Sequence, residues 1–447
     1  MPPLAKKIID QSAVVGVVGL GYVGLPLAVG FGQIGYTIIG LDVAADKVDQ
    51  LNAGSSYIPD VPSQRVADLV AAGRLKATTG YSGLAQADII FICVPTPFDA
   101  QKAPDLSFIR AAAAGIAAVL RPGQLIILQS TTYPGTTVEV VLPYLAETGL
   151  IVGEEFYLAF SPERIDPGQV ESAGFDVQNT PKVVGGVTET CTRLAADFLA
   201  KLTPQVHPVS SPAVAEMCKL LENTFRSVNI ALVNELTLLS DRMGIDIWEV
   251  IEAAKTKPYG FMPFYPGPGV GGHCIPVDPY YLSWKAREFD FYTKFIELAA
   301  EVNSEMPYFT VEKITQALNQ SGKTLSHAQI LILGVAFKRD IDDARNSPAE
   351  RVVELLLKAG AQVTFHDPYV KQFRVGGNVF LQEAVNIPWL PLNDENLAAV
   401  DCVIIITDHS NIDYPWVAQH SRLLFDSRNV TTLISKDQPH IVRLGAP

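Results

Sequence analysis

Ala13-Val14-Val15-Gly16-Val17-Val18-Gly19-Leu20-Gly21-Tyr22-Val23-Gly24 is the stretch that decides the fold of this chain. Its apolar first half predicts a buried parallel strand, and its Gly-x-Gly-x-x-Gly half leads into a helical pattern over 25–35. A second strand pattern over 37–41 ends at Asp42, about 20 residues beyond the glycines, where a dinucleotide fold places the carboxylate that binds the adenosine ribose. Pyrophosphate would then lie on the helix N-terminus. We therefore predict a nicotinamide or flavin dinucleotide site, and Asp42 favours NAD over NADP because a carboxylate repels a 2′-phosphate.

The alternation of strand and helix patterns continues along the chain and restarts after a helical interval. Strand patterns lie at 88–95, 124–129, 156–160, 329–336, 362–367, 399–406 and 423–426, and helical patterns at 106–120 and 348–359. Between the two sets, 211–243 is helical without a proline after Pro212, which predicts a long connecting helix. Alternating strands and helices form doubly wound parallel sheets. The predicted fold class is α/β, with two Rossmann-like doubly wound domains, 1–208 and 313–447, joined by a helical middle domain, 209–312.

The composition limits the classes of function. The net charge is −13, and no basic tract or aromatic-interleaved basic stripe occurs, so we expect no nucleic-acid partner. The first ten residues lack the apolar segment of a secretory signal, and no run approaches the roughly 18 apolar residues of a membrane helix. The five cysteines are scattered, which is typical of free thiols in a reducing compartment and offers no zinc-binding spacing. We expect a cytoplasmic protein that has no membrane or metal partner.

One cysteine lies among glycines in Gly267-Pro268-Gly269-Val270-Gly271-Gly272-His273-Cys274-Ile275-Pro276-Val277-Asp278, the segment that we call the thiol loop. Glycines let a ligand approach the backbone, so Cys274 in this setting is presented as a nucleophile rather than packed. The alternative is an ordinary Gly/Pro-rich surface loop. Adjacent side chains of an extended loop point apart, so we expect His273 to contact substrate or pack rather than act as the general base for Cys274.

Further motifs occur in a fixed order: Val94-Pro95-Thr96-Pro97, the run Ser130 to Thr136, Ser161-Pro162-Glu163-Arg164, Lys219 with Glu222-Asn223, Phe337-Lys338-Arg339-Asp340 and Asp343-Ala344-Arg345. With the glycine turn and the thiol loop, they resemble the UDP-glucose/GDP-mannose dehydrogenase family over essentially the whole chain. Enzymes of that family oxidise the C6 alcohol of a nucleotide sugar to a carboxylate with two NAD. The resemblance thus implies an NAD-dependent UDP-sugar 6-dehydrogenase.

The resemblance also implies roles for the catalytic residues. Lys219 and Asn223, four apart on one face of a predicted helix, would stabilise the substrate oxygen, while a water held by Asp278 and Thr131 takes the proton. Cys274 would then add to the aldehyde, and Glu163 would be the base for hydrolysis of the thioester.

The motifs and the resemblance together define three sets of candidate residues. The catalytic set is Cys274, Lys219, Asn223, Asp278, Glu163 and Thr131. NAD is expected at Gly19, Gly21, Tyr22, Val23, Gly24, Asp42, Lys47, Pro95, Thr96, Thr131 and Arg345, with Lys47 open to the alternative of a surface lysine. The UDP-sugar is expected at Glu163, Arg164, Lys219, Asn223, Arg226, Tyr265, Gly271, Gly272, Phe337 and Lys338, with Lys338 and Arg345 toward the pyrophosphate.

The sugar is indicated by details of two motifs. In UDP-glucose dehydrogenases the thiol loop resembles Gly-Gly-Ser-Cys-Phe-x-Lys-Asp, whereas in this chain His273 replaces the serine and Val277 replaces the lysine. The loop of this chain is similar to that of the N-acetylamino-sugar branch of the family. Arg226 lies seven residues after Lys219 on the same helix face, from which it could reach an acetamido carbonyl. We expect UDP-N-acetylglucosamine as substrate, with UDP-N-acetylmannosamine and UDP-glucose as alternatives.

Two other classes of protein remain open at this point. A two-electron 3-hydroxyacid dehydrogenase would not need Cys274, and a nucleotide-sugar sensor could discard both Cys274 and Lys219. Formation of two NADH per sugar would exclude both. The long helix is a plausible dimer interface, so we expect a homodimer or higher homo-oligomer.

Overall fold

The computed structural model describes residues 2–98, 103–165, 174–272, 275–435 and 438–446. The chain divides into two compact units, Met1–Glu222 with Tyr280–Tyr292, and Asn223–Pro279 with Thr293–Pro447. The three domain ranges expected from the sequence remain predictions. Within the described ranges, every helix is too short or too polar to span a bilayer.

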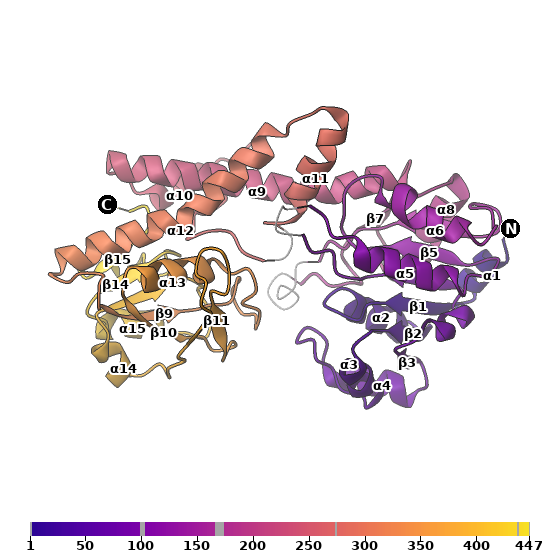
Figure 1. The fold of residues 1–447 in the computed structure, drawn as a ribbon, viewed down its shortest axis with the longest axis horizontal. Helices are drawn as coiled ribbons and strands as arrows, with labels where there is room; N and C mark the ends of the chain where they lie inside the picture. Colours follow the sequence, from indigo (N-terminus) through magenta and orange to yellow (C-terminus); the bar gives the residue numbers. More distant parts are fainter. Residues whose placement is uncertain (1, 99–102, 166–173, 273–274, 436–437, 447) are drawn as a thin grey trace. The chain divides into compact units, whose positions relative to one another are not determined.

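The first unit is built on an eight-stranded sheet of order β3-β2-β1-β4-β5-β6-β7-β8 (Figure 1). Its strands are β1 Val14–Val18, β2 Thr37–Leu41, β3 Leu75–Thr78, β4 Ile89–Ile92, β5 Leu125–Leu128, β6 Tyr157–Phe160, β7 Lys182–Gly186 and β8 Val206–Val209. The order up to β6 is that of a dinucleotide-binding fold, whose ligand lies at the carboxyl ends of the strands. The predicted parallel sheet is confirmed up to β6, after which β7 runs antiparallel to β6.

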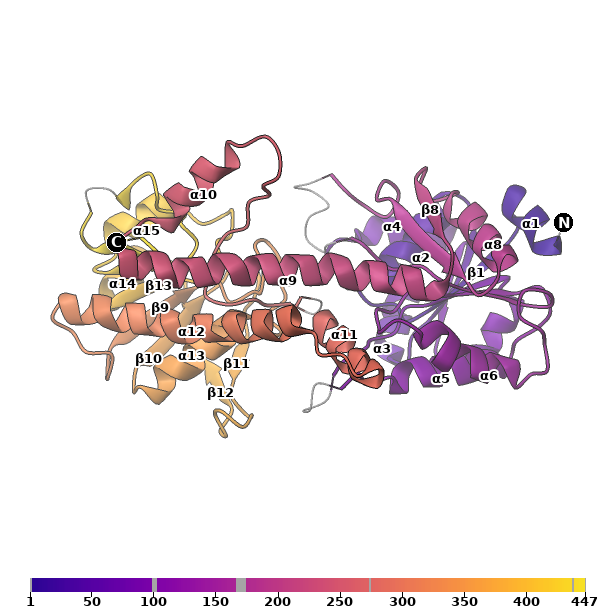
Figure 2. The same ribbon diagram turned by 90° about the horizontal axis from the view of Figure 1, so that it is seen from above.

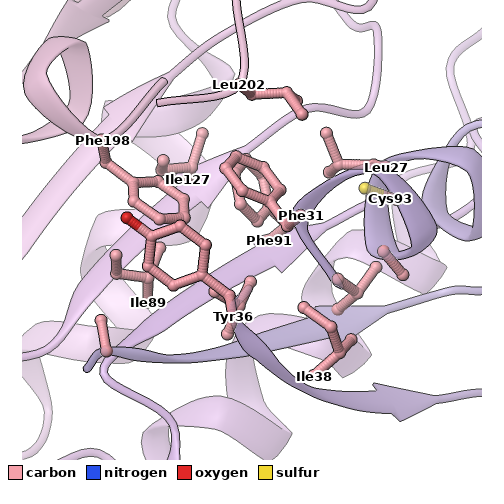
Figure 3. Packing of buried hydrophobic residues seen from close by; sticks show 14 of the residues in the cluster. Leu27, Phe31, Tyr36, Ile38, Ile89, Phe91, Cys93, Ile127, Phe198 and Leu202 are labelled. Carbon is pink, nitrogen blue, oxygen red and sulfur yellow. The ribbon is translucent and has the colours of Figure 1, made fainter. Parts of the chain in front are cut away.

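Both faces of this sheet are buried. Phe91 of β4 points to the face where Phe31 and Phe198 stack with their ring centroids 4.5 Å apart (Figure 3). Ile90 and Ile92 of the same strand are fully or almost fully buried on the opposite face, because successive side chains of a strand alternate. A sheet of this kind requires such two-sided cover, and its strands therefore read as continuous apolar runs.

The helices of the first unit connect these strands. They are α1 Pro3–Ile9, α2 Gly24–Gln33, α3 Ala45–Asn52, α4 Ser63–Ala71, α5 Ser107–Ala117, α6 Leu142–Ala146 and α8 Glu189–Leu199, with a 3₁₀ helix over Tyr81–Gln86 and a π-helical turn over Thr137–Val141. The sequence patterns indicated α2 and α5 but not α3, α4 or α8, whose apolar positions are fewer and interrupted by charges.

The second unit contains a five-stranded parallel sheet of order β10-β9-β13-β14-β15. Its strands are β9 Gln329–Leu333, β10 Gln362–His366, β13 Cys402–Ile405, β14 Leu424–Asp426 and β15 Ile441–Arg443, with a separate antiparallel pair β11 Phe373–Val375 and β12 Val385–Ile387. Its helices are α10 Ile247–Lys255, α12 Lys294–Gln320, α13 Pro348–Lys358, α14 Asp394–Ala399 and α15 Tyr414–His420. The expected second α/β sheet is therefore confirmed.

Helix α9, Pro212–Met243, is the predicted connecting helix and continues without interruption for 32 residues (Figure 2). Pro212 stands at its first position, where a missing N–H costs no hydrogen bond. Gly244, with φ +69°, follows its last residue, as is common after a helix C-terminus. The division between the two units falls within α9 and within α11, Asp278–Ala286, which is followed by a 3₁₀ turn over Arg287–Phe289.

Candidate active site

The glycine turn between β1 and α2 has three glycines in three different roles. Gly19 has φ +90°, and a Cβ there would lie 2.6 Å from the Cys93 carbonyl oxygen. A Cβ on Gly24 would lie 1.8 Å from the Gly19 carbonyl oxygen, so only glycine lets the helix start this close to the strand. A Cβ on Gly21 would meet nothing within 4 Å. The backbone at Gly21 is therefore open to a pyrophosphate, as the sequence pattern requires.

Asp42 lies directly after β2 and is anchored by the backbone. Its Oδ2 accepts from the Leu20 N–H at 3.0 Å and its Oδ1 from the Ala44 N–H at 3.0 Å. Each carboxylate oxygen keeps further acceptor capacity, so Asp42 can still receive two ribose hydroxyls. The Lys47 ammonium lies 5.3 Å from the centre of the Tyr57 ring, and the Tyr57 hydroxyl donates to the Leu20 carbonyl at 2.7 Å.

The other expected NAD contacts of the first unit lie in loops after the strands. Tyr22 is partly exposed in the glycine turn, and Val23 is the residue before α2. Pro95 and Thr96 follow β4, and the Thr96 hydroxyl donates to the Thr131 carbonyl at 2.8 Å. The Tyr281 hydroxyl donates to the Thr96 carbonyl. The loops after β4 and β5 are thereby linked at the carboxyl edge of the sheet.

Glu163 lies three residues after β6 and is almost completely buried. Its carboxylate accepts from the Lys182 ammonium at 2.8 and 3.0 Å and from the Gln129 amide at 2.8 Å. The backbone N–H groups of Arg164 and Ile165 donate to Oε1 at 2.8 and 3.0 Å. Burial alone would raise the pKa of Glu163, but Lys182 and these hydrogen bonds outweigh it and hold the pKa below its ordinary value. Glu163 is therefore a stable anion.

The Arg164 guanidinium pairs with a carboxylate other than that of its neighbour Glu163. It forms an ion pair with Glu222 of α9 at 2.6 Å and donates to the Pro181 carbonyl at 3.1 Å. The motif that contains Glu163 and Arg164 is thus joined to α9 within the first unit.

Lys219 and Asn223 lie one turn apart on α9, and both are buried. Asn223 donates to the Asp278 carboxylate at 2.5 Å, which leaves its second amide N–H for another acceptor. Among the described residues, the Lys219 ammonium has no hydrogen-bond or ion-pair partner. Because a buried ammonium without a partner is costly, Lys219 is suited to receive a negatively charged oxygen of a ligand.

The described end of the thiol loop packs on the segment that follows β9. A Cβ on Gly271 would lie 2.9 Å from Cβ of Phe337, and one on Gly272, where φ is +97°, would lie 3.0 Å from the Phe337 ring. Gly271, Gly272 and Phe337 are thus brought together within the second unit. Cys274 and its neighbour His273 lie outside the described residues.

The remaining expected substrate residues are less enclosed. Lys338 is half-buried, and the exposed Arg345 is held by both oxygens of Asp343 through a forked pair at 2.6 and 3.0 Å. Arg226 is exposed on α9. The Tyr265 hydroxyl donates to the exposed Glu252 of α10 at 2.9 Å, so it is already hydrogen-bonded at the protein surface.

Four residues of these sites were missed from the sequence. Gln129 and Lys182 hold Glu163, and Arg428 pairs with Asp408 at 3.0 Å next to Gly267 of the thiol loop. Glu216, fully buried on α9, accepts from the N–H groups of Gly135 and Thr137 at 2.6 and 2.9 Å. Burial raises the pKa of Glu216 in spite of these bonds. The sequence could have indicated Glu216 by its position one helical turn before Lys219. Its partner Gly135, however, lies about 80 residues away along the chain, and no local pattern predicts that contact.

Cys93, Cys191, Cys218 and Cys402 lie in apolar segments of the sequence, which predicts buried thiols, and this prediction is wrong for one of them. Cys93, Cys191 and Cys402 are buried as predicted, but Cys218 of α9 is only half-buried. In the part of the chain that the structure describes, no three His, Cys, Asp or Glu side chains are grouped so as to hold a metal ion.

Known proteins are similar to this chain over most of its length. The sequence matches the UDP-glucose/GDP-mannose dehydrogenase family in its NAD binding domain over 13–203, its central domain over 213–305 and its UDP binding domain over 331–433. The UDP-N-acetyl-D-mannosamine dehydrogenase of Pyrococcus horikoshii is 35% identical over 93% of this chain and 95% of that protein. The UDP-N-acetyl-D-glucosamine 6-dehydrogenase of Pseudomonas aeruginosa is 39% identical over 80% of this chain and 83% of that protein.

A solved structure agrees with the fold. The UDP-D-ManNAc dehydrogenase of Pyrococcus horikoshii superposes with a TM-score of 0.84 at 32% identity, covering 96% of this chain and 99% of that one. With a dinucleotide turn in one α/β unit and a second α/β unit beyond a long helix, the chain belongs to the UDP-glucose/GDP-mannose dehydrogenase family. It is an oxidoreductase, an NAD-dependent dehydrogenase of a UDP-sugar.

Proposed function

We propose that this enzyme oxidises the C6 alcohol of UDP-N-acetylglucosamine to the UDP-uronic acid, a four-electron reaction that proceeds through Cys274. The observation that carries the chemistry is the pair on α9: Lys219, buried without a partner among the described residues, and Asn223, whose amide is oriented by Asp278. Two donors on one helix face suit an oxygen that gains negative charge, an effect worth about 3 kcal/mol per donor.

The enzyme's own residues divide the reaction into two halves. The glycine turn and Asp42 would hold NAD, which would supply a hydride acceptor for C6 in each half. In the first, Lys219 and Asn223 stabilise the C6 oxygen, and the water bound by Asp278 and Thr131 takes the hydroxyl proton. In the second, the Cys274 sulfur bonds to the aldehyde carbon while its proton passes to the aldehyde oxygen. The resulting thiohemiacetal becomes a thioester when it loses a hydride from C6 and its hydroxyl proton to the same water.

Hydrolysis of the thioester completes the reaction. Water adds to the thioester carbon, its proton passes to Glu163, and the carbon–sulfur bond breaks to release Cys274 as a thiolate. Glu163 accepts five hydrogen bonds from four donor groups, more than the roughly four acceptor positions of a carboxylate, so one hydrogen bond must open to admit this water. Gln129 is an uncharged donor on a rotatable side chain, so its bond is the weakest of the side-chain bonds to Glu163.

The choice of sugar is supported by Arg226, by the sequence of the thiol loop and by the relative from Pseudomonas aeruginosa, which is 39% identical to this chain. UDP-N-acetylmannosamine is the second candidate, because the Pyrococcus horikoshii relative, which matches a larger share of the chain, carries that name.

We expect a higher kcat/KM for UDP-N-acetylglucosamine than for UDP-glucose by about one to two decades, because a donor left unpaired by glucose costs roughly 1–3 kcal/mol. A side-by-side assay of the two sugars and UDP-N-acetylmannosamine, each scored by NADH per sugar, measures this ratio. Arg226→Met should reduce the ratio, whereas the exposed Arg74→Met on the first unit should not. A higher kcat/KM for UDP-N-acetylmannosamine would transfer the assignment to that sugar.

We further propose that a second copy of the chain covers one face of α9. Phe225, Leu232, Leu236, Leu239 and Met243 are exposed and recur every three, four or seven residues on this helix. Such a long apolar stripe marks an interaction surface. A single helix stripe can pair with its own copy about a two-fold axis, which gives a closed dimer.

Light scattering should therefore give a mass of twice 48.4 kDa. Leu232→Glu with Leu239→Glu should shift the protein to monomer, because each chain would bury two charges in the dimer interface. Val379→Glu, at a fully exposed apolar residue outside the stripe, is the control. A monomeric unmodified protein at micromolar concentration would contradict the proposal.

A further inference from the structure

The Glu163–Lys182 pair contains a lysine with no expected role. Lys182 is the first residue of β7, and it is fully buried. An isolated ammonium in such a position is very costly, so the residue is tolerated only with its partner. The proposed reaction scheme gives Lys182 no role, although this buried cation contacts Glu163, one of the expected catalytic residues.

The strand direction explains how the two residues meet. β7 runs antiparallel to β6, with Ala159 opposite Gly186 and Phe160 opposite Gly185. Continuing this register by three residues places Glu163 opposite Lys182. The ammonium therefore lies at the carboxyl end of β6, at the edge of the sheet where ligands of such folds bind.

The surroundings of Glu163 leave Lys182 as the cation that neutralises it. The Arg164 guanidinium is paired with Glu222, and the nearby Cys93 thiol, which donates to the Gln129 side-chain oxygen at 3.7 Å, has its pKa raised by burial. Burial would also raise the pKa of Glu163 if Lys182 were absent, because burial is the largest single influence on that group.

We propose that Lys182 is a positioning residue for hydrolysis of the thioester, which holds the Glu163 carboxylate ionised and fixed at the carboxyl edge of the sheet. The proposal rests on the proposed function of Glu163. A base works only when deprotonated, so the lowered pKa of Glu163 keeps hydrolysis active down to acidic pH. Removal of the Lys182 charge should move the loss of activity to higher pH.

The test compares Lys182→Met and Lys182→Arg with the unmodified enzyme from pH 5 to 9. Lys182→Met should lower kcat for acid formation on the order of 10²-fold at neutral pH, within the range that a general base contributes, and leave KM for the UDP-sugar within about threefold. The acyl-enzyme should accumulate, which intact-mass spectrometry would detect. The acid limb of the pH profile should shift to higher pH. Lys182→Arg should restore the unmodified profile.

A double-variant cycle separates positioning from simple loss of stability. In a Glu163→Gln background, Lys182→Met should cause no further loss of rate, because Lys182 acts through Glu163. The double variant has no unpaired buried charge, so it should fold even if Lys182→Met alone does not. Arg121→Met, which removes a cation from buried Asp88 at the opposite edge of the same sheet, is the control: it should lower Tm without moving the pH profile.

Two outcomes would overturn the inference. One is an unchanged kcat and pH profile in Lys182→Met. The other is an equal loss from Lys182→Met with and without Glu163→Gln. If the unmodified enzyme formed no acyl-enzyme and no acid, the proposed function itself would fail, and that result is distinct from either.

Discussion

Replacement of Cys274 by alanine is expected to abolish formation of the UDP-uronic acid while NAD and the UDP-sugar still bind. The first oxidation needs only the alcohol, a proton acceptor and the donors on α9, whereas the second needs the covalent adduct on sulfur. The rate of acid formation should fall on the order of 10⁴-fold or more, the scale seen when an enzyme loses its nucleophile. Quantification of the acid and of NADH per sugar measures this loss.

The retained half-reaction gives the control for this variant. Cys274→Ala should still reduce a supplied C6 aldehyde with NADH. Cys274→Ser should accumulate an acyl-enzyme, because an alkoxide leaves less readily than a thiolate, and intact-mass spectrometry would show the added UDP-uronyl mass. Cys402→Ala, at a buried thiol of β13, should keep acid formation. Near-normal turnover of sugar to acid by Cys274→Ala would end the covalent mechanism.

Replacement of Lys219 by alanine is expected to slow both hydride steps together. The buried ammonium is proposed to stabilise the C6 oxygen in each, and loss of one such donor costs about 3 kcal/mol, or roughly 10²-fold to 10³-fold in kcat. Stopped-flow measurement of NADH formation from the sugar, and of aldehyde reduction in reverse, follows the two steps separately.

The contrast with Cys274→Ala is the decisive part of the Lys219 experiment. Aldehyde reduction should survive in Cys274→Ala and fall in Lys219→Ala. Lys76→Ala, at an exposed lysine of the same unit, should leave both rates unchanged. If Lys219→Ala raised only KM, Lys219 would bind the ground state and not the developing charge.

The sequence by itself determined the local features of this protein. The apolar run before Gly19, the three glycines and Asp42 predicted β1, the turn, α2 and the end of β2, because each depends on contacts within a few residues or on backbone sterics. The absence of proline after Pro212 predicted the length of α9 for the same reason. The ordered motifs also allowed the family to be assigned before any coordinates.

Only the tertiary structure decided which distant residues meet. Lys182 reaches Glu163 because β7 reverses direction beside β6, and no local pattern encodes strand direction. In the same way, Asn223 donates a hydrogen bond to Asp278, which lies 55 residues further along the chain. Glu216 on α9 accepts one from the backbone of Gly135. Such pairs are set by how whole elements pack, since a buried polar group must find its partner wherever the fold supplies one. The candidates for catalysis could therefore be named from the sequence, but the residues that hold them could not.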